Sequence, residues 1–227
     1  MGIKRFPWLS RALAVLRKDL QLEFRTRYAY SALVMFALTT LSTISFSLGG
    51  SMADTDVAAA LLWMILFFSA MTGLARTFIQ EEEAGTVLAL KMAADPEPVF
   101  LGKYLFNTVL LFSLTVLIVP LYLLMSNLSV ANVRGFLATV LLGVLGLAGA
   151  GTILAAIAAR AAAKGSVMTV LSFPILLPLL ISAISATSTA FAGGLPESMM
   201  TDLGLLFFYN GIVLAASFLL FEYVWNE

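Results

Sequence analysis

The 227-residue chain contains no cysteine and no histidine. The missing cysteine excludes disulfides, thiolate metal sites and haem attached through cysteine. The missing histidine removes the commonest general base near neutral pH and, together with cysteine, the usual ligands of haem, zinc and copper. We therefore predict a chain that is not an enzyme, with no catalytic residue, no metal site and no cofactor of its own.

Charge is also scarce, because only 11% of the residues are charged while 61% are apolar. A soluble domain has about 25% charged and about 45–50% apolar residues. The mean hydropathy of +1.00 agrees with this contrast, and membrane lipids are the expected surroundings. The formal net charge is +0, so the chain has no basic surplus and we expect no nucleic-acid partner.

Six apolar runs are long enough to cross a bilayer, which takes roughly 20 residues in a helix. They are Tyr28–Leu48, Val57–Leu74, Tyr104–Met125, Gly135–Ala159, Val167–Ala186 and Leu203–Phe221. None carries a charged residue well inside it. The sequence therefore predicts an all-α membrane protein in which residues 28–227 form a six-helix transmembrane domain.

The basic residues lie almost entirely on one side of this predicted topology. Only Arg134, of thirteen lysines and arginines, falls on the other side. The positive-inside rule then places both termini in the cytoplasm. The twelve residues of the cytoplasmic set are Lys4, Arg5, Arg11, Arg17, Lys18, Arg25, Arg27, Arg76, Lys91, Lys103, Arg160 and Lys164. We expect the first run to be a retained anchor, because no small-residue cleavage site follows it.

Residues 1–27 form a cytoplasmic tail with an amphipathic helix predicted over Trp8–Arg27. An apolar stripe recurs at spacings of three and four, which is typical of one helix face. The stripe consists of Leu9, Leu13, Leu16, Leu20 and Phe24. A basic amphipathic helix before a span is expected to lie in the headgroup plane. It serves either as a topology anchor alone or as a lever that contacts a cytoplasmic partner.

The longest polar connection is the segment 76–103, between the second and third runs. Three consecutive glutamates, 81–83, precede a predicted short helix over Ala84–Met92, where acidic residues in the first turn suit the helix dipole. Pro96 and Pro98 are expected to end this helix. The segment is either a docking surface or a solvated loop with an incidental helix.

The spans lack the residues that drive transport directly. No carboxylate, histidine or lysine lies deep within a run, and no phosphate-binding P-loop motif occurs. Energy for directed work would therefore come from another chain. The fourth run is rich in glycine and alanine, which indicates close helix packing, either within the chain or in a dimer.

The order of these features resembles the membrane subunits of ABC-2-type exporters and, more narrowly, the cytochrome c biogenesis haem exporter protein B (CcmB) family. The resemblance covers nearly the whole chain. The residues that carry it are Leu16–Arg27 (LRKDLQLEFRTR), Phe78–Leu90 (FIQEEEAGTVLAL), Gly102–Asn107 (GKYLFN), Ala159–Gly165 (ARAAAKG) and Val170–Ile184 (VLSFPILLPLLISAI).

The resemblance implies a type V exporter-like permease fold in a bacterial inner (plasma) membrane. It implies a homodimer of membrane subunits paired with two copies of a separate ABC ATPase subunit, which binds the ATP. Hydrolysis would release a haem-loaded chaperone during c-type cytochrome maturation, while another membrane protein handles the haem.

The resemblance also assigns a coupling helix to Glu81–Met92, seated on the ATPase and flanked by the N-terminal helix. The implied docking residues are Glu81, Glu82, Glu83, Gly85, Thr86 and Leu88, with Arg17 and Arg25. Two other functions stay open at this point. One is an ABC-2 permease that exports a drug, a lipid or a polysaccharide, and the other is a membrane scaffold without an ATPase.

Overall fold

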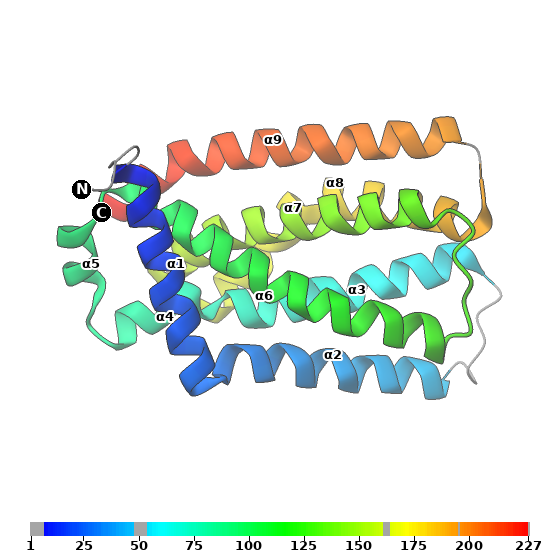
Figure 1. Ribbon diagram of the computed structural model, residues 1–227, viewed down its shortest axis with the longest axis horizontal. Coiled ribbons are helices and arrows are strands. Elements are labelled where there is room, and N and C mark those ends of the chain that lie inside the picture. Colours follow the sequence, from blue (N-terminus) through cyan, green and yellow to red (C-terminus); the bar gives the residue numbers. More distant parts are fainter. Residues whose placement is uncertain (1–6, 48–53, 161–163, 195, 227) are drawn as a thin grey trace, which may run out of the picture.

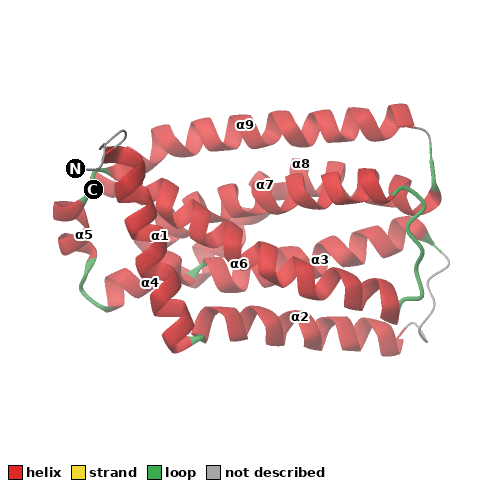
Figure 2. Ribbon diagram, viewed as in Figure 1, coloured by secondary structure: helices red, strands yellow, loops and turns green. Residues whose placement is uncertain are grey.

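The computed structural model describes residues 7–47, 54–160, 164–194 and 196–226, and within these ranges it contains helices and no strand (Figure 2). The helices are α1 (Pro7–Thr26), α2 (Tyr28–Ser47), α3 (Thr55–Leu74), α4 (Arg76–Glu83), α5 (Val87–Ala93), α6 (Pro96–Met125), α7 (Val133–Arg160), α8 (Lys164–Ala192) and α9 (Pro196–Asn226). The predicted first-span end at Leu48, most of the connection after it, Lys4, Arg5 and part of the Ala159–Gly165 motif lie outside the described residues.

The long helices α2, α3, α6, α7, α8 and α9 run side by side along the long axis of the molecule (Figure 1). The helix α1 lies across one end of this bundle, and α4 and α5 lie at the same end. Both described chain ends are also found there, as an even number of passes requires. The other end carries the α6–α7 and α8–α9 connections.

The prediction of an all-α protein with six spans is confirmed. Six helical segments among the described residues are long and apolar enough to cross a membrane, and α3 with α4 forms one of them, Thr55–Glu83. Apolar runs locate such spans well because the bilayer core excludes charge. They locate the ends poorly, since a helix continues into the interface where polar side chains are tolerated.

The start of α6 corrects two predictions. The third apolar run begins at Tyr104, but the helix begins at Pro96, directly after Asp95 in an extended conformation. Proline suits the first turn of a helix because its missing N–H would have no partner there. Pro96 and Pro98 therefore begin α6 and do not end the preceding helix.

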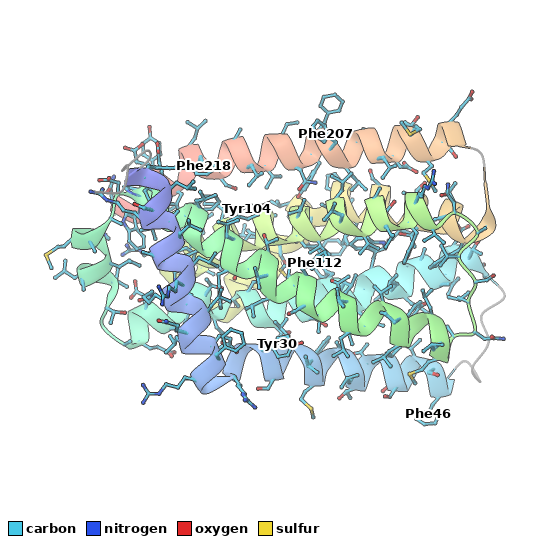
Figure 3. The ribbon with its side chains drawn as sticks, viewed as in Figure 1. Tyr30, Phe46, Tyr104, Phe112, Phe207 and Phe218 are labelled. Atoms are coloured by element: carbon cyan, nitrogen blue, oxygen red, sulfur yellow. The ribbon has the colours of Figure 1, made fainter. Side chains whose placement is uncertain are left out.

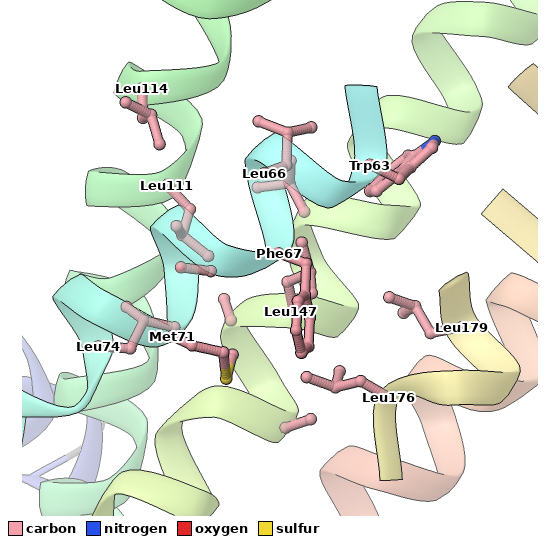
Figure 4. Packing of buried hydrophobic residues seen from close by; sticks show 14 of the residues in the cluster. Trp63, Leu66, Phe67, Met71, Leu74, Leu111, Leu114, Leu147, Leu176 and Leu179 are labelled. Atoms are coloured by element: carbon pink, nitrogen blue, oxygen red, sulfur yellow. The ribbon is translucent and has the colours of Figure 1, made fainter. Parts of the chain in front are cut away.

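The helix α7 lies at the centre of the bundle, and its glycines allow close packing within the chain. A Cβ atom added at Gly143 would lie 2.0 Å from the Trp63 ring, and one at Gly146 would lie 2.0 Å from the Leu179 side chain. Figure 4 shows these side chains gathered between α3, α7 and α8. The internal-packing interpretation of the fourth run is thus confirmed for these positions.

Large apolar side chains cover the outside of the bundle. Phe46 on α2 is 86% exposed and Phe207 on α9 is 65% exposed, and both point away from the bundle in Figure 3. Such a surface is unfavourable in water and favourable against lipid tails, which are as apolar as the side chains themselves. The outer surface therefore agrees with the composition.

Candidate functional site

The turn between α4 and α5 is closed by its own backbone. The N–H of Gly85 donates to the Glu82 carbonyl at 3.1 Å, and the N–H of Thr86 donates to the Glu81 carbonyl at 3.0 Å. Gly85 has a φ of +66°, in the left-handed region that a residue with a Cβ adopts at a cost of about 1–2 kcal/mol. A Cβ atom there would meet nothing within 4 Å, so the backbone conformation, and not crowding, favours glycine.

This turn corrects the prediction of a single helix over Ala84–Met92 with an acidic first turn. Glu81, Glu82 and Glu83 instead form the last turn of α4, and α5 begins only at Val87. Carboxylates are unfavourable at the C-terminal end of a helix, where the dipole is negative. At Glu81 this penalty is offset by lysines from other helices.

Glu81 belongs to a buried charge cluster, defined here as Lys18, Asp19, Glu81 and Lys103. The Lys103 side chain is 2% exposed, and its Nζ lies 2.9 Å from Glu81 Oε1 and 3.0 Å from Asp19 Oδ2. It also donates to the Thr77 carbonyl at 3.0 Å. Burying a charge is unfavourable unless it is paired and hydrogen-bonded, and Lys103 satisfies both conditions.

Lys18 closes the charge cluster on its outer side. Its Nζ pairs with Asp19 Oδ1 at 2.9 Å and also with Glu81 Oε1, while its side chain remains 44% exposed. Burial lowers the pKa of Lys18, but the neighbouring carboxylates outweigh this effect and raise the pKa above its ordinary 10.5. Lys18 therefore stays charged at neutral pH, and two positive charges balance two negative ones between α1, α4 and α6.

The helix α1 is confirmed over Pro7–Thr26, and it packs against α6 through a face beside its apolar stripe. Ala12, Val15 and Asp19 are buried, whereas Leu13 of the stripe is 49% exposed and free to face lipid. A Cβ atom at Gly102 would lie 2.7 Å from the Ala12 carbonyl oxygen and 2.7 Å from Val15 Cβ. The absent side chain at this position lets α1 approach α6.

Two exposed contacts connect the first half of α1 to Asp95 and to the first turn of α6. Arg11 Nη1 lies 2.7 Å from Asp95 Oδ2, and Trp8 Nε1 donates to Glu97 Oε2 at 3.1 Å. Exposed ion pairs contribute little, about 0–1 kcal/mol, so the buried charge cluster is the stronger link.

The predicted docking residues divide into buried and exposed positions. Glu81 is 7% exposed, and its Oε2 accepts a hydrogen bond from Thr86 Oγ1 at 2.5 Å. Glu82 is half-buried, 3.9 Å from Arg160 Nη1. Leu88 on α5 is 68% exposed. The remaining exposed members are Glu83, Gly85, Thr86, Arg17 and Arg25. Their role in docking stays a prediction.

A groove of about 430 Å³ separates α1 from the α4–α5 turn. It brings together residues that are far apart in the sequence and includes three predicted docking positions. Its lining residues are Lys18, Gln21, Leu22, Arg25, Gln80, Glu81, Ala84 and Thr86. Beside it, none of the seven residues of α5, all of them described, is buried, and Met92 is 78% exposed. This end thus combines a groove, lined by polar residues and the apolar parts of their side chains, with an exposed apolar face on α5.

Asp19 and Lys103 were not among the site residues predicted from the sequence. Lys103 was predicted to lie in the cytoplasmic connection between the second and third spans, because the third apolar run was expected to begin after it. A signal for Asp19 does exist, since Ala12, Val15, Asp19 and Glu23 follow helical spacing and form the buried face. The described residues contain no group of three acidic residues that could hold a metal ion.

The fold and this site define a class: a multi-pass, all-helical membrane protein with a structured polar end built from α1, α4 and α5. The profile of the family described as "CcmB protein" matches residues 10–221, and the chain belongs to that family. It is 26% identical over 210 residues to "Heme exporter protein B" of Bradyrhizobium diazoefficiens, covering 90% of this chain and 95% of that protein. The chain is thus a multi-pass protein of the bacterial inner membrane.

Proposed function

We propose that this chain is the membrane subunit of an ATP-driven complex that supports haem delivery during c-type cytochrome maturation. A separate ABC ATPase subunit would dock on the α4–α5 turn, on α5 and on the groove beside α1. The observation that carries the proposal is the buried charge cluster, because it fastens this exposed turn to two other helices. A force applied to the turn would therefore reach the bundle.

The family supports the haem-related part of the proposal. The relative from Bradyrhizobium diazoefficiens is named a haem exporter protein. The present chain has no histidine and no cysteine, which supply the usual haem ligands. We therefore propose a division of labour in which another membrane protein holds the haem, a chaperone carries it away, and this subunit transmits conformational change. A homodimer within the complex belongs to the same proposal.

Two alternatives differ from this proposal in observable ways. An ABC-2 permease for a drug, a lipid or a polysaccharide would also bind an ATPase, but its deletion would leave holo-cytochromes unchanged. A membrane scaffold would bind no ATPase at all. Deletion of the gene is expected to abolish holo-c-type cytochromes while the apoproteins persist.

Charge reversal at the turn tests the docking site. In Glu82→Lys/Glu83→Lys, two negative charges at the end of α4 become positive, and we expect the co-purifying ATPase to be lost. Glu197→Lys is the control, because Glu197 is an exposed glutamate at the start of α9, at the opposite end of the molecule. Pull-down from mild detergent followed by mass spectrometry measures both variants.

A second variant separates docking from misfolding, since Glu82 lies near Arg160. Leu88→Asp changes an exposed side chain and leaves the charge cluster untouched, so this variant is expected to fold and to lose the ATPase. Retention of the ATPase in Leu88→Asp and in the double variant would contradict the proposal.

A further inference from the structure

A second polar network lies next to the charge cluster and links three helices. Thr77 Oγ1 of α4 donates to Asn107 Oδ1 of α6 at 2.8 Å, and Asn107 Nδ2 donates to Thr152 Oγ1 of α7 at 2.8 Å. Asn107 and Thr152 are fully buried, and Thr77 is 5% exposed. We call these three residues the amide bridge.

The amide bridge is continuous with the charge cluster. Thr77 and Glu81 are four positions apart on α4, and Lys103 and Asn107 are four positions apart on α6, so each pair lies on one helix face. Lys103 Nζ also donates to the Thr77 carbonyl at 3.0 Å. Polar contacts therefore run without a break from the α4–α5 turn to Thr152 in the second half of α7.

Thr77 differs from most other hydroxyl residues in the neighbouring spans. Thr72 donates to the Phe68 carbonyl, Thr108 to the Tyr104 carbonyl and Thr115 to the Leu111 carbonyl, each four positions earlier in its own helix. Thr77 donates across to another helix. The carbonyl four positions before Thr77 belongs to Gly73, near the end of α3, and it is the acceptor that we expect the hydroxyl to use if α4 shifts.

We propose that Asn107 is a positioning residue that transmits displacement of α4 to α7, with the bond from Thr77 as the contact that changes partner. This inference rests on the proposed function, since it assigns a route to the force delivered at the turn. An element with two arrangements is what coupling between distant sites requires. The two arrangements are the Thr77 hydroxyl bonded to Asn107 and the same hydroxyl bonded to the Gly73 carbonyl. Movement that reaches α7 would pass to the helices that it packs against, which are α3, α4, α6, α8 and α9.

The principal test is Asn107→Leu in the full complex, purified with the ATPase that accompanies it. Leucine has a similar volume. Thr152 Oγ1 already donates to the Ala148 carbonyl at 2.6 Å, and we expect Thr77 Oγ1 to turn to the Gly73 carbonyl at the end of α3. We expect the ATPase to co-purify at the wild-type yield and ATP hydrolysis to continue, while holo-cytochrome formation falls about tenfold. The matched control is Thr115→Val, a buried hydroxyl on the same helix that bonds only within it.

A second pair of variants keeps the test decisive if Asn107→Leu does not assemble. Thr77→Val is expected to lose holo-cytochrome formation in the same way, and Thr77→Ser, which restores the hydroxyl, is expected to recover it. Equal output from Asn107→Leu and Thr115→Val would overturn the inference. So would loss of the ATPase in proportion to the loss of cytochrome, which indicates a structural role. Absence of any ATPase from the wild-type complex would instead overturn the proposed function, and this inference with it.

Discussion

At the scale of single residues, Lys103 decides whether the charge cluster holds. Its ammonium group is buried at the meeting point of three helices and faces both Asp19 and Glu81. Removing one partner of a buried ion pair leaves an uncompensated buried charge. The resulting loss of folding free energy is larger than that from breaking an exposed ion pair.

Lys103→Met is therefore expected to destabilise the folded protein by about 3 kcal/mol, because two carboxylates would remain buried with only Lys18 nearby. Thermal unfolding in detergent measures the change. Lys18→Met is the matched control, since that side chain is 44% exposed and its removal is expected to lower stability by about 1 kcal/mol or less. Equal losses in the two variants would show that burial of Lys103 contributes nothing.

The sequence could not reveal this cluster in full. Glu81 and Lys18 are 63 positions apart, and only the packing of α1 across the bundle brings them together. A residue's type indicates whether it favours burial or a helix. Which charges pair with one another depends on tertiary contacts that the sequence does not show. Leu88 and Glu83 are exposed, as their position in a polar segment indicates, and their role in docking stays a prediction.

At the scale of elements, the angle and closeness of α1 depend on Gly102. A methyl group at this position would collide with the Ala12 carbonyl and with Val15. Backbone cannot give way as a flexible side chain can, so α1 would have to move outward.

Gly102→Ala is thus expected to loosen α1 and to increase its cleavage by protease under native conditions. The control is Gly211→Ala on α9, where an added Cβ meets nothing within 4 Å. That change is expected to be neutral or stabilising by about 0.5–1 kcal/mol, because alanine favours a helix more than glycine does. Equal protease sensitivity in the two variants would refute the role of Gly102.

Element by element, the length of the apolar runs predicted the six spans, and helical periodicity predicted the amphipathic α1. The break between α4 and α5 was not predicted. Three glutamates favour the first turn of a helix, and the lysines that stabilise Glu81 in the last turn of α4 come from other helices. The beginning of α6 was also missed, since Pro96 fits the end of one helix and the start of the next equally well.

At the scale of the whole molecule, the protein is a bundle with an apolar outer surface and one structured polar end. Both described chain ends, α1, α4 and α5 gather there, and twelve of the thirteen basic residues were assigned to the same side from the sequence. The central claim is that this end faces the cytoplasm and receives its energy from an ATPase seated on α5.

The absence of native cysteine makes a single introduced thiol a clean reporter of this claim. Leu88→Cys places it on the exposed face of α5, and a membrane-impermeant maleimide can be applied to inside-out vesicles and to intact spheroplasts. The account predicts labelling only in inside-out vesicles, with protection when the ATPase is present and loss of protection after it is stripped. Labelling in spheroplasts, or equal labelling with and without the ATPase, would contradict it.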